Sequence, residues 1–197
     1  MRFSVDAHAI GCHLTGNEVY IRNLLQEFDS LDRDSEFFAY LSTEGASACI
    51  PARFTCDRVS RNPFRRLGFD LPRKLRRDRP DLVHVQYTAP LSCPVPIVVS
   101  VHDVSFLEHP EYFTRSRSWQ LRVTVARTVR AAARILTPSE FSRRSILRAY
   151  SVPGDKVVVV PSAVSSAFRP VLRQAALERI QSRFRIPGPF ILTVGDV

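Results

Sequence analysis

Short apolar runs alternate with longer amphipathic stretches along most of this chain. Apolar side chains occupy consecutive positions in the runs, as is typical of strands that are buried on both faces of a parallel sheet. The expected strands span residues 2–6, 37–41, 54–59, 82–85, 97–101, 134–136 and 156–160. Apolar residues recur at three- and four-residue spacing over the main expected helices, 17–28, 116–132 and 140–150. We therefore expect an α/β fold, a Rossmann-like parallel sheet with helices on both faces.

The same patterns predict which helix faces are buried. In the second of these helices, Trp119, Val123 and Ala126 share one face, with arginines opposite, so we expect this face to pack against the sheet. Phe141 belongs to a core-like pattern at the start of the third helix. Ser139 precedes that helix and is a favourable N-cap residue.

A proline-containing stretch separates the last part of the chain from the rest. We expect residues 1–168 to form one Rossmann-like domain, followed by a linker over 169–189 that contains a helix. Residues 190–197 begin with a new apolar run, which we interpret as the first strand of a truncated second domain.

Polar residues follow the ends of several expected strands. His102 and Asp103 come directly after the run over 97–101, and His84 lies near the end of the preceding strand. Ligands of an open parallel sheet bind beyond the carboxyl ends of its strands, so these side chains are candidate site residues. A histidine and an aspartate that satisfy buried backbone groups or turns explain the pair at 102–103 equally well. For His84, a buried structural role is the favoured interpretation.

Gly16 and Asn17 lie where the first loop leads into the first helix. The free N–H groups and the dipole at a helix start form a site for a phosphate group. An ordinary helix start in which Gly16 adopts a positive φ explains the same residues.

The chain has a net charge of +9, and many of its basic residues lie between positions 61 and 79, among them Arg73, Arg76 and Arg77. Such a patch favours anionic lipid headgroups, sugar pyrophosphates or nucleic acid, and a solvated surface explains it equally well. We expect no nucleic acid partner, because no known binding module is present and the aromatic residues lie in core-like patterns. For the basic segment we expect peripheral association with an anionic membrane surface.

The four cysteines form no C-x-x-C pair, which indicates reduced thiols of an intracellular protein. His8, Cys12 and His13 match no common ligand template, so we expect no metal site. No apolar run approaches the length of about 18 residues that a membrane span requires, and the N-terminus lacks the features of a signal peptide. We therefore expect a cytoplasmic location.

Six motifs spread over the whole chain occur together and in this order in one known family. The chain resembles the N-terminal domain of retaining glycosyltransferases of family 4. The matching motifs are Val5-Asp6 with Thr15-Gly16-Asn17-Glu18, Pro80-Asp81-Leu82-Val83-His84, Val99-Ser100-Val101-His102-Asp103, Thr137-Pro138-Ser139-Glu140-Phe141-Ser142, Lys156-Val157-Val158-Val159-Val160-Pro161 and Phe190-Ile191-Leu192-Thr193-Val194-Gly195.

The resemblance implies two Rossmann-like domains that face each other across a cleft, the GT-B fold. It implies transfer of a sugar from a nucleotide diphosphate sugar to a saccharide or lipid-linked acceptor, with retained anomeric configuration and without a metal or other cofactor. Gly16 and Asn17 would lie against the donor pyrophosphate, and His102 near the donor sugar and the reaction centre. Asp103, His84 and Ser139 complete the set of expected donor- or acceptor-binding residues.

Two features depart from the family pattern. Pro161 is followed by Ser162-Ala163 where the family often has Asn-Gly. The nucleotide site of the family belongs to its second domain, so we expect this chain alone to be inactive. A free-standing Rossmann-like module that binds a nucleotide or another anionic ligand is the alternative interpretation.

Overall fold

A computed structural model describes residues 1–12, 15–164, 168–186 and 189–193. The chain divides into two compact units, Met1–Ser162 and Ala163–Val197. The first unit therefore ends slightly before the domain boundary expected at residue 168.

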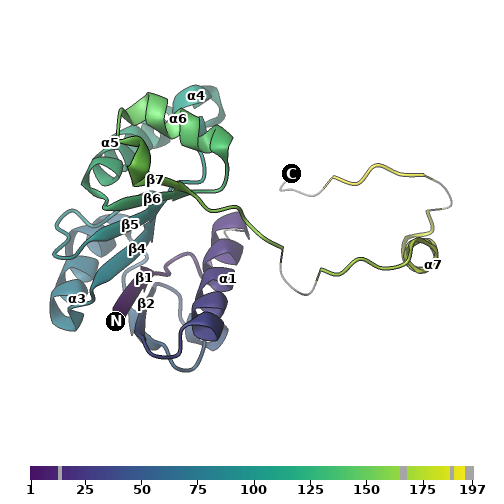
Figure 1. Ribbon diagram of the computed structural model, residues 1–197, viewed down its shortest axis with the longest axis horizontal. Helices are drawn as coiled ribbons and strands as arrows, with labels where there is room; N and C mark the ends of the chain where they lie inside the picture. The colour runs from purple at the N-terminus through teal and green to yellow at the C-terminus, as the bar shows by residue number, and fades with distance from the viewer. Residues whose placement is uncertain (13–14, 165–167, 187–188, 194–197) are drawn as a thin grey trace. The chain divides into compact units, whose positions relative to one another are not determined.

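The first unit contains a sheet of seven strands, all parallel, in the order β3-β2-β1-β4-β5-β6-β7 (Figure 1). The strands are β1 (Arg2–Asp6), β2 (Glu36–Leu41), β3 (Thr55–Arg58), β4 (Leu82–Gln86), β5 (Ile97–Ser100), β6 (Arg134–Thr137) and β7 (Val157–Val159). Each of the seven strands expected in this unit is present with boundaries that differ by at most one residue, which confirms the predicted parallel α/β fold.

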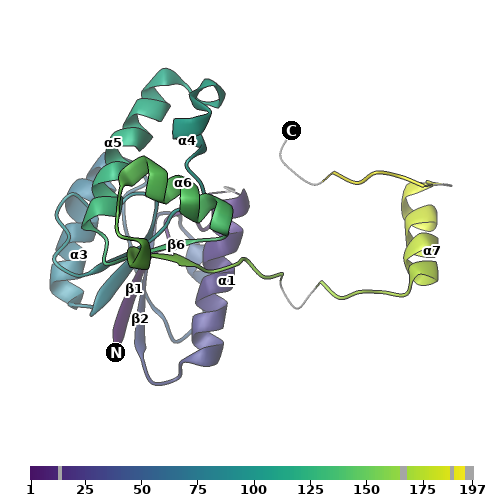
Figure 2. The ribbon, with the colours of Figure 1, turned by 45° about the horizontal axis from the view of Figure 1, so that its top comes forward.

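Helices cover both faces of this sheet. They are α1 (Thr15–Leu31), α2 (Pro63–Arg65) with a π-helical turn (Arg66–Asp70), α3 (Leu71–Asp78), α4 (Ser105–Glu108), α5 (Arg115–Ala131) and α6 (Glu140–Tyr150). Figures 1 and 2 show α1 on one side of the sheet and α3, α5 and α6 on the other.

Two separate hydrophobic cores reflect these two faces. Along β2, Phe37 and Ala39 pack in the core that contains Ile21 of α1. The alternate residues Phe38 and Tyr40 belong to the other core, which contains apolar residues of α3, α5 and α6. Side chains on successive residues of a strand point to opposite faces, so one strand contributes to both cores.

The predicted buried face of α5 is right for Ala126, which packs against the core, and wrong for Trp119 and Val123. Trp119 is 68% exposed and Val123 is also exposed, whereas Val125 and Val129 are buried. The buried face also contains Thr128, whose hydroxyl accepts a hydrogen bond from the backbone N–H of Ala89 at 2.9 Å. A short polar side chain that finds a partner in the core can occupy a buried position, so the apolar pattern alone predicted only part of the buried face.

Phe141 is likewise exposed rather than part of the core. The predicted N-cap of α6 is confirmed, because the Ser139 hydroxyl accepts a hydrogen bond from the N–H of Ser142 at 3.1 Å. This cap fixes where the helix begins, and Phe141 in the first turn then points to solvent while Ile146 is buried.

The second unit contains the helix α7 (Arg173–Phe184), none of whose residues is buried. Residues 189–193 form no strand, although we expected one from residue 190. A strand needs a neighbour to pair its backbone groups, and the described part of this unit offers none. Residues 194–197, with the end of the expected strand, and the break at 187–188 lie outside the described residues.

Candidate functional site

The carboxyl edge of the sheet connects two candidate residues from distant parts of the chain, Asn17 and His102, through the side chain of Gln86. The Gln86 side chain, at the end of β4, donates a hydrogen bond from Nε2 to the backbone carbonyl of Asn17 in α1, at 3.3 Å. Its Oε1 lies 3.3 Å from Nε2 of His102, which follows β5. His102 and the first turn of α1, which contains Gly16, therefore lie at one edge of the sheet.

This arrangement fixes the tautomer of His102. The Gln86 amide uses its NH₂ group on Asn17, so its oxygen must accept from His102. His102 therefore carries its proton on Nε2 and keeps a lone pair on Nδ1. Burial lowers the pKa of His102, and the smaller opposing effect of the Asp103 carboxylate does not cancel this. His102 is thus a neutral imidazole at neutral pH, and no hydrogen bond to its Nδ1 is found among the described residues.

Two tyrosines hold the His102 ring from its sides. The ring centroid of Tyr20 lies 4.6 Å away and that of Tyr87 5.7 Å away, both in edge-to-face geometry. The Tyr20 hydroxyl in turn lies 2.8 Å from Oγ of Ser100, which ends β5. Edge-to-face contacts favour one ring orientation, so these contacts restrict the imidazole before any ligand binds.

His84 lies beneath this layer and is buried, as the favoured interpretation expected. Its Nε2 is 2.8 Å from Oγ of Ser100, the same oxygen that contacts Tyr20. Burial lowers the pKa of His84 to about 4; the charge of His102 adds to this shift and that of Asp6 opposes it. His84 is therefore neutral, and in this geometry it supports Ser100 and Tyr20.

A cavity of about 320 Å³ opens beside His102, which is not itself among the described residues that line it. The His102 side chain lines a separate small cavity of about 10 Å³ together with Tyr20 and Ser100. Gln86, Tyr87 and Asp103, which surround His102, line the larger cavity together with Asn17. The opposite wall comes from α5, which contributes among others Arg117. The volume is of the size that small-molecule sites have, and the polar groups of the sheet edge converge on it.

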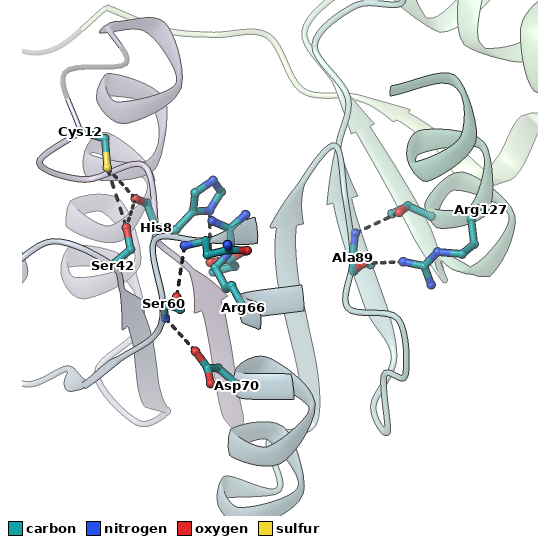
Figure 3. Close-up of polar contacts among 11 residues, drawn as sticks. His8, Cys12, Ser42, Ser60, Arg66, Asp70, Ala89 and Arg127 are labelled. Carbon is teal, nitrogen blue, oxygen red and sulfur yellow. Dashed lines mark hydrogen bonds and ion pairs between the residues drawn. The ribbon is translucent and has the colours of Figure 1, made fainter. Parts of the chain in front are cut away.

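An ionic cluster that was not expected from the sequence lies at the end of β1. Asp6 is only 1% exposed, yet Nδ1 of His8 lies 3.2 Å from its Oδ1 and Nε of Arg66 lies 3.5 Å from its Oδ2. Burial raises the pKa of Asp6, but His8 and Arg66 together outweigh burial and hold the pKa below its usual value. Figure 3 shows His8 and Arg66 side by side, and both line the cavity. Asp6 belongs to one of the motifs that match the family. No local sequence pattern indicated that Arg66 would lie beside it.

Asp103 and Ser139 are both engaged in local structure. Oδ1 of Asp103 accepts a hydrogen bond from the N–H of Ser105 at 2.9 Å, and its Oδ2 accepts one from the hydroxyl of Tyr87 at 3.2 Å. The Ser139 hydroxyl caps α6, as described above. The structure thus assigns both residues to backbone organisation at the edge of the sheet, and their contacts with a ligand stay predictions.

Gly16 lies within the first turn of α1 rather than before the helix, and its φ is not positive. The expected left-handed glycine is therefore not found. Apart from the adjoining residues and the backbone of the helix itself, no atom of the described residues lies within 4 Å of where a Cβ would be at Gly16, so the helix surface is open toward them at this point. The open backbone is compatible with close approach of a phosphate group.

The three arginines of the predicted membrane patch are not equivalent. On α3, Arg76 donates to the Ser92 hydroxyl at 3.1 Å, and Arg77 contacts Asp57 and Asp78. Arg73 has no polar partner among the described residues. These side chains lie outside the cavity beside His102.

Within the described ranges, no three His, Cys, Asp or Glu side chains are placed to hold a metal ion. Cys12 is instead hydrogen-bonded to the carbonyl of His8 at 3.2 Å, also visible in Figure 3, and His13 lies outside the described residues. The described helices include none with the length and apolar character needed to cross a membrane.

The chain is similar to known proteins in sequence and in fold. The family model described as Glycosyltransferase Family 4 matches residues 14–168. O-antigen chain mannosyltransferase B of Escherichia coli is 34% identical over 73 residues, which are 37% of this chain and 19% of that protein.

Solved structures share the fold at low identity. Anabaena Alr3699/HepE in complex with UDP-glucose has a TM-score of 0.59 at 14% identity, and the match covers 92% of this chain and 49% of that one. A glycosyltransferase from Rickettsia africae has a TM-score of 0.55 at 14% identity, over 95% of this chain and 50% of that one. The chain thus spans about half the length of these structures and about a fifth of the curated relative.

Proposed function

Because the chain belongs to glycosyltransferase family 4, we propose that it is the N-terminal half of a retaining glycosyltransferase. The complete enzyme would transfer a sugar from a nucleotide diphosphate sugar to a saccharide or lipid-linked acceptor. The names of the E. coli relative and of the Anabaena complex with UDP-glucose support this substrate class.

One observation carries the proposal, the hydrogen-bonded connection from His102 through Gln86 to Asn17. It joins the histidine expected near the donor sugar to the helix start expected near the pyrophosphate. The cavity beside this connection provides the space in which a donor sugar and an acceptor hydroxyl would meet.

The chemistry follows from the charges of this edge. Negative charge develops on the diphosphate as it leaves, and the N–H groups at the start of α1 stabilise it without moving. Neutral His102 presents Nδ1 as an acceptor, so it orients a sugar hydroxyl through a hydrogen bond. Tyr20 and Tyr87 keep the ring in place, which reduces the entropy lost when the sugar binds.

An NMR titration of the 197-residue chain with UDP-glucose tests the proposal. We expect weak, saturable binding that His102→Ala reduces and that His109→Ala, a change of an exposed histidine, leaves unchanged. Tighter binding of a single-stranded oligonucleotide than of any sugar nucleotide would contradict it.

An activity assay distinguishes the proposed half of an enzyme from the alternative, a free-standing binding module. If the chain is half of an enzyme, it should show no turnover of a sugar nucleotide by itself. Turnover by the purified chain would show that the described edge is a complete active site.

A further inference from the structure

Three buried polar atoms beside the cavity of about 320 Å³ have no hydrogen-bond partner among the described residues. They are Oδ1 of Asp6, Nδ1 of His8 and Nε of Arg66, and we name these three residues the Asp6 cluster. His8 and Arg66 line the cavity, and Arg66 is only 7% exposed. A buried guanidinium nitrogen without a hydrogen bond is unfavourable, so it indicates an oxygen atom that a ligand or water supplies.

The Asp6 carboxylate sets the tautomer of His8. Its Oδ1 lies 3.2 Å from Nδ1 of His8, and an ionised carboxylate can only accept a hydrogen bond. The proton of the neutral imidazole therefore resides on Nδ1, and Nε2 keeps a lone pair. Nδ1 is buried whereas 22% of the His8 side chain is exposed, so the accessible part of the ring is the side that carries Nε2.

The charges of the Asp6 cluster favour a neutral ligand. Nε of Arg66 lies 3.5 Å from the second carboxylate oxygen, Oδ2, so the charges of Asp6 and Arg66 balance each other. His8 and Arg66 lie side by side in Figure 3, and one offers a lone pair while the other offers N–H groups. A hydroxyl group matches this pair, because it donates its proton to the imidazole and accepts on its oxygen from the guanidinium. A fully ionised phosphate group has no proton for Nε2.

Another part of the cavity wall is apolar. Phe113 and Leu121 line it, and both are partly buried against the core. A pyranose ring has the same two-sided character, with hydroxyl groups at its edge and C–H groups on its face. Apolar walls with a few polar groups that fix orientation are typical of small-molecule sites, and this combination suits one sugar ring.

We propose that His8 and Arg66 bind one hydroxyl group of the acceptor saccharide. The hydroxyl donates to Nε2 of His8 and accepts from Arg66, while Asp6 holds His8 in the tautomer that this contact requires. The inference rests on the proposed function, which places the donor sugar near His102. Because His102 lines a separate small cavity, the larger cavity is left for the acceptor. His8 and Arg66 thereby determine the orientation in which the acceptor is held.

NMR of the imidazole groups of the 197-residue chain tests the tautomer and the contact. Long-range proton–nitrogen spectra distinguish a protonated ring nitrogen from one with a lone pair, and we expect neutral His8 to carry its proton on Nδ1. The methyl glycosides of glucose, galactose and mannose serve as probes. At least one of them should shift the Nε2 signal of His8 saturably, whereas the exposed His109 should not respond.

The variant Asp6→Asn tests the role of the carboxylate. The new amide should turn its oxygen toward the guanidinium of Arg66, because its NH₂ group would face another donor there. The NH₂ group then faces Nδ1 of His8, which has to accept, so the imidazole proton should move to Nε2. We therefore expect the other tautomer in this variant, together with about tenfold weaker binding of the glycoside.

Deoxyfluoro analogues of the glycoside identify the bound hydroxyl. Fluorine has no proton to donate, so replacement of one particular hydroxyl should weaken binding to the wild-type chain about tenfold. In His8→Phe the same replacement should have no effect, because the partner of that proton is already absent. His109→Phe is the matched control and should bind every analogue as the wild-type chain does. An effect specific to one hydroxyl and one histidine does not arise from a general loosening of the fold.

Several results would overturn the proposal. These are a His8 ring that no glycoside shifts, an unchanged tautomer in Asp6→Asn, or fluorine effects that are the same in the wild-type chain and in His8→Phe. Displacement of the glycoside by inorganic phosphate would assign the Asp6 cluster to an anion instead. Circular dichroism establishes that each variant is folded, and the tautomer of His8 in the wild-type chain gives a test that needs no variant.

The two proposals fail in different experiments. The shift of His8 by the glycoside should persist when UDP-glucose is present, and displacement by UDP-glucose would assign the Asp6 cluster to the donor and overturn the acceptor site. A wild-type chain that binds UDP-glucose but no glycoside refutes the acceptor site alone. A chain that binds the glycoside at His8 but no sugar nucleotide refutes the proposed donor site instead.

Discussion

His84 should make the stability of the first unit depend on pH between 7 and 5. The folded state lowers its pKa from 6.5 to about 4, because burial disfavours the charged imidazole. The unfolded chain therefore binds a proton near pH 6.5 that the folded chain does not bind until about pH 4. The unfolded state gains stability as the pH falls through this window, so folding is weakened in acid.

The size of the effect follows from the two pKa values. Each unit of pKa difference corresponds to about 1.4 kcal/mol, and the full shift corresponds to about 3 kcal/mol. At pH 5 the unfolded imidazole is almost fully protonated and the folded one is not, so about 2 kcal/mol is lost relative to pH 7. Such a loss is large against the stability of about 5–15 kcal/mol that is typical of a domain.

The titratable groups near His84 do not reverse the direction of this pH dependence, in which stability falls as the pH falls. His102 also has a lowered pKa and therefore acts in the same direction. The pKa of Asp6 lies below its usual value of 3.8, so Asp6 stays ionised in both states at pH 5. Tyr20, whose ring centroid lies 6.3 Å from that of His84, has a raised pKa and stays neutral.

Urea denaturation followed by circular dichroism at pH 7 and pH 5 measures the effect. The wild-type chain should lose about 2 kcal/mol or more between the two values, and His84→Gln should lose much less. His109→Gln, a change of an exposed histidine, should behave as wild type. An equal loss in wild type and in His84→Gln would refute the assignment of this pH dependence to His84.

Three further changes test other contacts. Gln86→Leu removes both hydrogen bonds of the side chain, and two such bonds at about 1 kcal/mol each predict a loss of about 2 kcal/mol in urea denaturation; UDP-glucose binding by NMR titration should also weaken, because His102 loses the partner that orients it. Tyr40→Phe leaves the buried Asp78 carboxylate without the hydroxyl that lies 2.9 Å away, so denaturation should show a loss of about 1–3 kcal/mol, against none for the exposed Tyr112→Phe. Ser139→Ala should cost about 1 kcal/mol through loss of the cap, and Ser139→Asp should restore most of it; an unchanged melting temperature in the alanine variant would contradict this.

The strands and helices were predictable because their signals are local. The consecutive apolar residues of β4 and β5 and the N-cap of α6 each lie within a few positions of one another. The buried face of α5 was not predictable in this way. Thr128 is buried because Ala89, far away in the sequence, donates a hydrogen bond to it, and no pattern within the helix reports that contact.

The same distinction applies to the site. His102 could be placed at the carboxyl edge of the sheet, because it directly follows an apolar run. The role of Gln86 as the connection to Asn17 requires the strand order, in which β1 and β4 are neighbours although they are far apart in the sequence. The pairing of Asp6 with Arg66 depends on the path of the π-helical turn, which the sequence pattern did not indicate.

The charges at the sheet edge indicate which part of a sugar nucleotide this half would hold. Among the described residues that line the cavity, the guanidinium groups are those of Arg66 and Arg117. Asp6 beside Arg66 and the Asp103 carboxylate in the cavity wall balance these two charges, and His102 is neutral. A site with balanced charge and several fixed hydrogen-bonding groups suits sugar hydroxyls better than a diphosphate. At this edge the start of α1 is the electropositive feature. Under the proposed function, we therefore expect further positive charge for the leaving diphosphate to be supplied by groups outside the first unit.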